Sequence, residues 1–558
     1  MIFAQLRGYS SKLIMAVAFL GTTFMIPSIA ADPINAPKLL VIGTSGILAS
    51  ALLLVFYRDF RIKLKDKIII ISMLMFLDLT IVLFTNNRVE DQFFGSLGRN
   101  TGYLAFISFL ALFILARQVA NMTLLSQIDL TLLVTGLFSL VYGLLQVYDL
   151  DPVQWAPSGY TRIFGFLGNP NFASAFMGIF ASSCFAKLIS RKVNSLKSLA
   201  NFAFIISSLW VIWNSESTQG FLVFMVGAAS AITIRIQIAG NQTLKIVWYV
   251  ISLSGFTGVV LGMLQKGPLT QFLYKDSISF RGDYWRSAWN IGINNPIDGV
   301  GIDNFGENYR RYRDVEATLR RGADVTSNSP HNVFLDFLVN GGFLLFGLYI
   351  TLVLITLFTC IKVIRSSKTY LPTYASVFAA WMGYLAQSVI SVNQLGLAIW
   401  GWILMGILLG INRNTNSDQL EIVDKKPKKA TKIEVESSPT LILVGFLGAL
   451  LGVVLSILPI KSSLDYMSSL RSGDVHQLMS NALQRPIQAE RILNIAMLFN
   501  ANKFEDNSLE LLRRAVILYP NKFEIWQALS VMTNATPSEK SEALIQMKRL
   551  DPHNTDLK

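Results

Sequence analysis

The part of the sequence best equipped for chemistry is a polar, arginine-rich stretch from about 265 to 342, which interrupts long apolar runs and contains Ser329-Pro330-His331-Asn332. The chain has only three histidines, and His331 is the only one before residue 476. An imidazole titrates near neutral pH and can accept a proton from a substrate hydroxyl. His331 is therefore the candidate general base. The alternative is a histidine at a helix entry that hydrogen-bonds only its own turn.

Two arginines precede this histidine in the segment Arg281-Gly-Asp-Tyr-Trp-Arg286. Guanidinium groups bind phosphate through paired hydrogen bonds and stay charged in a partly dry site. Residues five apart on one helix point about 140° away from each other, so this pair would converge on one ligand only if a helix begins between them. The stretch predicts a site for an anionic group such as a lipid-linked pyrophosphate; attraction to phospholipid headgroups is the alternative. Arg310, Arg311 and Arg313 are expected to form a solvated or lipid-facing cluster.

The elements that must position these residues are transmembrane helices. Hydrophobic residues make up 52% of the chain and charged residues only 15%, a combination that is rare in soluble proteins of this length. Apolar windows of about 17 to 22 residues, enough to cross about 30 Å of hydrocarbon, recur about thirteen times. We therefore predict an all-α, polytopic membrane protein of about thirteen transmembrane helices. Both cysteines, Cys184 and Cys360, lie in predicted spans, which excludes a disulfide framework.

Lysine and arginine in the short loops predict the orientation of these spans. They cluster after the second, sixth and tenth spans and before the last one, as expected of cytoplasmic loops. This places the amino terminus inside, the carboxyl terminus outside and the long loop of about 265–342 on the outer face of the cytoplasmic membrane. The first apolar segment, with Arg7 and Lys12 before it and Ser28 to Ala31 after it, also fits a signal peptide. We favour an uncleaved first span.

The chain changes character after Ile460, where long apolar runs give way to short amphipathic ones. Pro486, Pro520 and Pro552 are spaced 34 and 32 residues apart, which resembles the tetratricopeptide pattern of paired helices. A plain helical hairpin cap is the alternative. The predicted organisation is a membrane catalytic domain (1–412), a cytoplasmic linker (413–438), the last transmembrane helix (439–460) and an extracytoplasmic tetratricopeptide-like domain (461–558).

Several short motifs occur in an order that resembles the O-antigen ligase and O-antigen polymerase superfamily. Besides the Arg281 to Arg286 segment they are Asn295-Pro-Ile-Asp-Gly-Val-Gly301, then Ser329 to Asn332 followed by Asn340-Gly-Gly342, and an earlier Arg162-Ile-Phe-Gly-Phe-Leu-Gly-Asn-Pro-Asn171 entering a span. The resemblance covers about 160–345. It implies a membrane glycosyltransferase that moves a glycan from a polyprenyl diphosphate carrier to an acceptor hydroxyl, with no cofactor, nucleotide sugar or metal.

The resemblance also implies roles for particular residues. His331 would deprotonate the acceptor hydroxyl, and Arg281 would bind the diphosphate leaving group. Two further positions are assigned to the acceptor or to orientation of the imidazole: Asn332, and Asp336, which would otherwise face solvent. Weaker candidates for phosphate contact are Arg286 and Arg162, and the predicted topology adds Arg99.

One departure from the family pattern concerns the segment Asn214 to Gly220. Many members have a Ser-Arg pair there, whereas this segment contains no arginine. Arg162 and Arg99 are the substitutes that the predicted topology allows. Asp283 and Asp303 are expected to be isolated carboxylates, too few to form a metal site.

Other functions remain open at this point. The acceptor can be a lipid, a glycan or a protein, so a polysaccharide polymerase and a protein O-oligosaccharyltransferase are alternatives to a ligase. A lipid-linked glycan flippase or transporter would also need many spans and an arginine-lined path, but few charged residues lie inside the spans. A membrane scaffold is a third class. The C-terminal domain suggests a protein partner, and nothing suggests nucleic acid.

Overall fold

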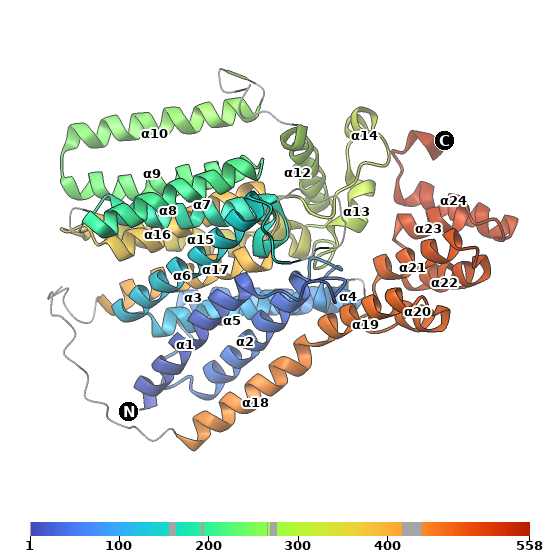
Figure 1. Cartoon of the computed structure of the whole chain (residues 1–558), viewed down its shortest axis with the longest axis horizontal. Helices are drawn as coiled ribbons and strands as arrows, with labels where there is room; N and C mark the ends of the chain where they lie inside the picture. The colour runs from blue at the N-terminus through green and yellow to red at the C-terminus, as the bar shows by residue number, and fades with distance from the viewer. Residues whose placement is uncertain are drawn as a thin grey trace.

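The computed structural model describes residues 2–86, 88–153, 155, 163–190, 195–264, 266–267, 270, 276–415 and 438–557, with the backbone alone for residues 195, 276–279 and 412–415. Within these ranges the regular structure is entirely helical, which confirms the predicted all-α class. Figure 1 shows long helices packed side by side in a bundle, with the short C-terminal helices gathered beyond one end of it. Helices α12 (Asp276–Asn294), α13 (Phe305–Tyr312) and α14 (Val315–Arg321) adjoin this end.

The first half of the chain supplies most of the bundle. Its elements are α1 (Ile2–Thr23), α2 (Asn35–Val55), α3 (Lys67–Thr85), α4 (Val89–Phe94), α5 (Tyr103–Val119), α6 (Met122–Val147), η1 (Gly165–Leu167), α7 (Pro170–Leu188), α8 (Ser195–Asn214), α9 (Gln219–Ala239) and α10 (Gln242–Met263). Asn169 caps α7 by accepting a hydrogen bond from the Asn171 N–H, and Pro170 occupies its first turn, as expected for a helix start. The Asn-Pro-Asn sequence thus marks the entry of the chain into the bundle.

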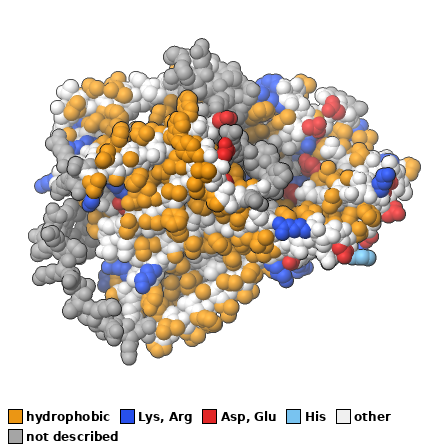
Figure 2. Space-filling view, in the orientation of Figure 1, with side chains coloured by type: hydrophobic (Ala, Val, Ile, Leu, Met, Phe, Trp, Pro, Cys, Tyr) orange, Lys and Arg blue, Asp and Glu red, His pale blue; other side chains and the backbone are white. Residues whose placement is uncertain are grey.

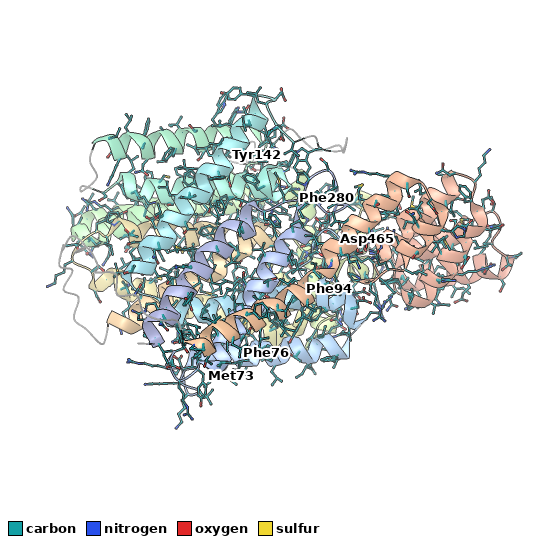
Figure 3. All side chains as sticks on the ribbon, turned by 60° about the horizontal axis from the view of Figure 1, so that its bottom comes forward. Met73, Phe76, Phe94, Tyr142, Phe280 and Asp465 are labelled. Atoms are coloured by element: carbon teal, nitrogen blue, oxygen red, sulfur yellow. The ribbon has the colours of Figure 1, made fainter. Side chains whose placement is uncertain are left out.

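Eight helices in the described part of the chain are long and apolar enough to cross a bilayer: α2, α3, α6, α8, α9, α10, α15 (Val333–Ser366) and α18 (Pro439–Ser456). Two shorter apolar helices, α5 and Leu395–Ile411 within α17 (Leu395–Thr415), join them, and α16 (Pro372–Ile390) packs beside α17. The number thirteen remains a prediction. The face of the bundle in Figure 2 is mainly hydrophobic. Met73 and Phe76 of α3, labelled in Figure 3, are further exposed apolar side chains of the bundle.

The predicted outer loop is built from three further helices. These are α12 (Asp276–Asn294), α13 (Phe305–Tyr312) and α14 (Val315–Arg321), and the loop then runs into α15. The backbone of α15 leaves helical geometry at Gly341 and Gly342. A short helix, residues 333–340, therefore precedes the long apolar part.

Two of the motifs in this loop pack directly against each other. The Val300 N–H donates to the Val339 carbonyl (2.9 Å), and the Phe343 N–H donates to the Pro296 carbonyl (2.9 Å). Gly299 and Gly342 have positive φ angles (+62° and +67°), and a Cβ at either position would collide with the facing backbone. Only glycine combines these angles with so close an approach. The glycines thus hold the start of α15 against the end of α12.

The C-terminal part forms a helical domain with its own hydrophobic core. After α18 it comprises α19 (Leu458–Ser472), α20 (Val475–Ala482), α21 (Ala489–Ala501), α22 (Glu505–Leu518), α23 (Phe523–Ser530), α24 (Pro537–Leu550) and η2 (Thr555–Leu557). Consecutive helices pack as pairs, α21 with α22 and α23 with α24. This paired arrangement is compatible with the tetratricopeptide interpretation, which stays a prediction, as do the exact domain boundaries.

The expectation for the second arginine cluster is wrong for two of its members. Arg310 and Arg313 are 5% and 2% exposed, and both form ion pairs with Asp551 in the C-terminal domain. A buried guanidinium needs a carboxylate partner. The sequence does not show this partner because it lies more than two hundred residues away.

Candidate functional site

His331 lies in a tight turn directly before α15. Its backbone adopts a positive φ of 52°, which is uncommon for a residue other than glycine. The turn is held by the Ser327 hydroxyl, which donates to the Ser329 carbonyl (2.7 Å), and by the Ser329 hydroxyl oxygen, which accepts from the His331 N–H (3.2 Å). Such a strained backbone at a partly buried histidine is often found at functional positions.

The next residue secures the helix that follows. The side-chain oxygen of Asn332 accepts hydrogen bonds from the backbone N–H groups of Phe334 (3.0 Å) and Leu335 (3.1 Å). This is the ordinary geometry of an N-cap. The structure therefore shows Asn332 fixing the start of α15, and its assignment to the acceptor stays a prediction.

The imidazole ring rests on an aromatic side chain from α12. The rings of Tyr284 and His331 have centroids 5.6 Å apart and an interplanar angle of 28°. Tyr309 of α13 contacts the ring of Tyr284 edge-on, with centroids 5.5 Å apart. Tyr284 is not among the residues for which the sequence motifs predicted a role. A signal was present, because Tyr284 lies three residues after Arg281 and neighbouring positions on a helix surface have this spacing.

Arg281 also comes from α12 and is largely withdrawn from solvent, which lowers the pKa of its guanidinium. No carboxylate among the described residues lies within ion-pair distance of it. Burial first, and then the positive charges of Arg281 and Arg99, together lower the pKa of His331 from 6.5 to about 4. The imidazole is consequently neutral at pH 7. The structure thus brings together the predicted base, the predicted diphosphate ligand and Arg99.

Arg99 approaches from the segment before α5 and lies between two carboxylates. Its guanidinium nitrogen Nη2 is 3.0 Å from Asp303 and 3.6 Å from Asp336, and Nη1 donates to the Asn328 carbonyl. Asp336 is buried, so it holds Arg99 rather than facing solvent. Asp303 is not isolated either, since it also accepts from the Ser96 N–H (2.7 Å). Two acidic groups therefore fix this arginine beside the turn that carries His331.

Arg286 lies apart from this group. Helix α12 begins before both Arg281 and Arg286, so the condition for their convergence on one ligand is not met. Arg286 is half exposed and pairs with Asp283 and with Asp314 (2.7 Å). Asp283 was expected to be isolated, which is wrong: it is buried and also binds Arg320 (2.6 Å) and Arg321 (3.3 Å). This acidic centre already satisfies the charge of Arg286.

The segment that lacks the family arginine packs on the Asn-Pro-Asn motif. The Ser217 hydroxyl donates to the Asn171 side-chain oxygen (2.8 Å) and accepts from the Ser174 hydroxyl (2.9 Å). Gln219, at the start of α9, is buried with no hydrogen-bond partner for its amide among the described residues. Arg162 lies outside the described residues, so only Arg99 of the two proposed substitutes has a defined position.

Metal ligands are sparse in the part of the chain that the structure describes. No group of three or more histidine, cysteine, aspartate or glutamate side chains lies close enough to hold a metal ion there. The fixed positive charges of the site are arginines. This arrangement can bind an anion and accept a proton.

Comparison with known proteins agrees with this description. Residues 202–350, which run from α8 into the long apolar part of α15, match the O-Antigen ligase family. No curated protein matches the chain. The match contains Arg281, Tyr284 and His331, so it confirms the resemblance over the segment that carries the site. Together with the apolar helices, it indicates a multi-pass membrane protein that is similar to this family over residues 202–350.

Proposed function

We propose that the protein is a membrane glycosyltransferase that moves a glycan from a polyprenyl diphosphate carrier to an acceptor hydroxyl. The observation that carries this proposal is a partly buried arginine, Arg281, with no carboxylate partner among the described residues, near a neutral histidine, His331. A cation without a protein counter-charge is a natural site for an anionic ligand, and a neutral imidazole is ready to accept a proton.

The reaction requires one bond to form and one to break. The acceptor oxygen attacks the anomeric carbon while His331 takes its proton, and the bond from that carbon to the diphosphate oxygen breaks. Negative charge then develops on the departing diphosphate. Arg281, whose charge no described carboxylate meets, is the fixed cation that stabilises this charge, and Arg99 is held near it by Asp303 and Asp336. This division of labour needs no metal ion and no cofactor.

Donor binding would also raise the basicity of His331. Burial, and after it the charges of Arg281 and Arg99, lower the pKa of His331 in the free protein. A bound diphosphate would offset those charges and raise the pKa of the imidazole toward its ordinary value. The base would therefore become stronger when the donor is in place, which favours transfer to the acceptor.

The family match supports a ligase or polymerase type of enzyme, and the acceptor is a further choice between lipid, glycan and protein. We place the reaction at the outer face of the cytoplasmic membrane, with the amino terminus inside and the carboxyl terminus outside, because the short-loop charges favour that orientation. Candidates for additional phosphate contact are Arg286 and Arg162. The C-terminal domain is the candidate surface for a protein partner.

The proposal is tested by measuring transfer of a polyprenyl-diphosphate-linked glycan by the purified protein, with carrier binding followed in parallel. The wild type is expected to transfer the glycan, also in chelator, and His331→Ala is expected to bind carrier without transferring. Carrier binding without transfer by either protein, combined with movement of the carrier across vesicles, would indicate a flippase instead. Loss of activity in chelator that magnesium restores would contradict the arginine-based mechanism.

A further inference from the structure

The C-terminal domain contacts the outer loop through a buried cluster of charges. Asp551 follows α24, and its Oδ2 lies 2.6 Å from Arg313 Nη2 and 3.3 Å from Arg310 Nη1. Arg310 also pairs with Glu524 (3.3 Å) and lies over the ring of Phe523, 4.2 Å from its centroid. Asp551 is 1% exposed. The domain therefore supplies the counter-charge for two arginines of α13 and its C-terminal end.

The same two arginines hold the segment that leads to the candidate base. Arg310 Nη1 donates to the Ala323 carbonyl (2.7 Å), and Arg313 Nη1 donates to the Val325 carbonyl (3.2 Å). Two residues after Val325 comes Ser327, whose hydroxyl closes the turn containing His331. Each arginine thus bridges the C-terminal carboxylate and the backbone of residues 322–326.

A second line of contacts joins the same cluster to the imidazole. The guanidinium of Arg313 lies 6.0 Å from the centroid of the Tyr309 ring. Tyr309 packs edge-on against Tyr284, and Tyr284 stacks on His331. The backbone route and the aromatic route therefore both run from Asp551 to the same side chain.

The C-terminal domain has other attachments that do not involve Asp551. The Ala31 N–H donates to the Ser463 carbonyl (3.2 Å), the Asp32 N–H donates to the Ser463 hydroxyl (2.6 Å), and the Tyr519 hydroxyl donates to Asp91 (3.2 Å). Figure 3 shows α19, labelled at Asp465, between the bundle and the rest of the domain. A change at Asp551 can therefore loosen the loop while the domain stays attached.

We propose that the C-terminal domain is a positioning part of the candidate active site, in which Asp551 acts through Arg310 and Arg313 to fix the turn that carries His331. The inference deepens the proposed function and rests on it for the reaction. It assigns Arg310 and Arg313 to positioning rather than to the diphosphate, because their charges are met by carboxylates. Removing Asp551 leaves two buried guanidiniums short of a counter-charge, which favours their release to water and frees the carbonyls.

The first test compares Asp551→Asn with wild type in the full-length protein. Asn keeps the size of the side chain and removes its charge. We expect transfer at saturating donor to fall about 10- to 100-fold, as a displacement of about 1 Å can cause, while the KM for donor and the affinity for carrier stay near wild type because Arg281 is untouched. The control is Arg513→Gln, which breaks an exposed ion pair with Glu539 in the same domain and is expected to change neither quantity.

A second variant covers the case in which Asp551→Asn does not fold. Arg313→Lys keeps a positive charge beside Asp551, but one ammonium group cannot reproduce the fork that joins the carboxylate to the Val325 carbonyl. Hydrogen exchange is measured alongside, and backbone amides of residues 322–331 are expected to exchange faster in both variants. Amides of α21 and α22 are expected to exchange as in wild type.

The outcomes separate this inference from the proposed function. A wild type without transfer activity contradicts the proposed function, and the hydrogen-exchange comparison then still tests the positioning contact. An active wild type with equally active, equally protected Asp551→Asn and Arg313→Lys variants overturns the positioning inference alone. Equal loss of transfer and carrier affinity would also overturn it, because that pattern indicates general misfolding.

Discussion

The ring of His331 lies against the ring of Tyr284, with centroids 5.6 Å apart and planes inclined by 28°. This contact joins helix α12, which carries Arg281, to the turn before α15. It restricts rotation of the imidazole and shields one of its faces from water. The candidate base and the candidate diphosphate ligand are thus set in a fixed relation by one aromatic side chain.

The Tyr284 contact predicts a difference between two substitutions. Tyr284→Phe keeps the stacked ring and is expected to retain most of the transfer activity, whereas Tyr284→Leu removes the flat surface and is expected to lower the transfer rate about tenfold. Carrier affinity should stay similar in both, because neither removes Arg281. Steady-state transfer assays with carrier-binding titrations check this. Equal activity of the two variants would show that stacking does not position the base.

Arg281 and Arg286 lie on the same helix, so Arg286 is a suitable control for a substitution of Arg281. Arg281→Ala is expected to weaken carrier binding about 10- to 100-fold, the cost of losing charge-assisted hydrogen bonds to a phosphate. Arg286→Ala is expected to have a much smaller effect, since Arg286 is half exposed and its charge is met by Asp283 and Asp314. Titration with a fluorescent polyprenyl diphosphate measures both affinities. A larger loss in the Arg286 variant would move the diphosphate site to the Asp283 side of α12.

Arg99 serves two purposes that can be separated. Arg99→Met leaves the buried carboxylates of Asp303 and Asp336 without their cation and is expected to destabilise the fold by roughly 3–5 kcal/mol. Adding Asp336→Asn removes one of the two uncompensated charges and should restore part of that stability. Carrier affinity should remain low in the double variant, because the arginine is still absent. Thermal unfolding and carrier titration together distinguish the structural effect from the ligand effect.

The pH dependence of the reaction reports on His331. The free protein lowers the pKa of this group to about 4, so kcat/KM for donor is expected to hold until the pH falls near that value. The decrease of kcat on the acid side should begin at a higher pH than that of kcat/KM, because the bound diphosphate offsets the positive charges of Arg281 and Arg99. If kcat and kcat/KM fell at the same pH, donor binding would not raise the pKa of His331, contrary to this prediction.

The lowered pKa of His331 also makes the stability of the folded protein depend on pH. Since the folded pKa of His331 is about 4 and the ordinary value is 6.5, the unfolded chain binds more protons between these values. The free energy of unfolding contributed by this group therefore falls as the pH drops from about 6.5 to about 4 and is constant above and below that range. Comparing unfolding of wild type and His331→Gln across this range isolates the contribution.

Several features were predictable from local sequence alone. Apolar runs predicted the helices because a bilayer demands a fixed length of apolar residues, and the order of motifs predicted the family that matches residues 202–350. The choice of His331 followed from the scarcity of histidine. The exact span count and the orientation remain predictions, because the length and composition of helices do not define a membrane around them.

Charge partners were the weakest part of the sequence analysis. Arg310 and Arg313 appear in a dense basic run, which by composition indicates a solvated surface. Their burial depends on Asp551, which is distant in sequence and belongs to another domain. Asp283 likewise appeared isolated because Arg320 and Arg321 reach it only after α14 folds back toward α12.

The sequence by itself determined the helical membrane class, the separate C-terminal domain and the residue types available for chemistry, since these depend on local composition and spacing. Only the tertiary structure decided which of the arginines has no carboxylate beside it. An arginine's role depends on whether its charge is already compensated, and compensation is set by distances between segments far apart in the chain. Arg281 has no carboxylate partner among the described residues, whereas Arg99, Arg286, Arg310 and Arg313 are paired.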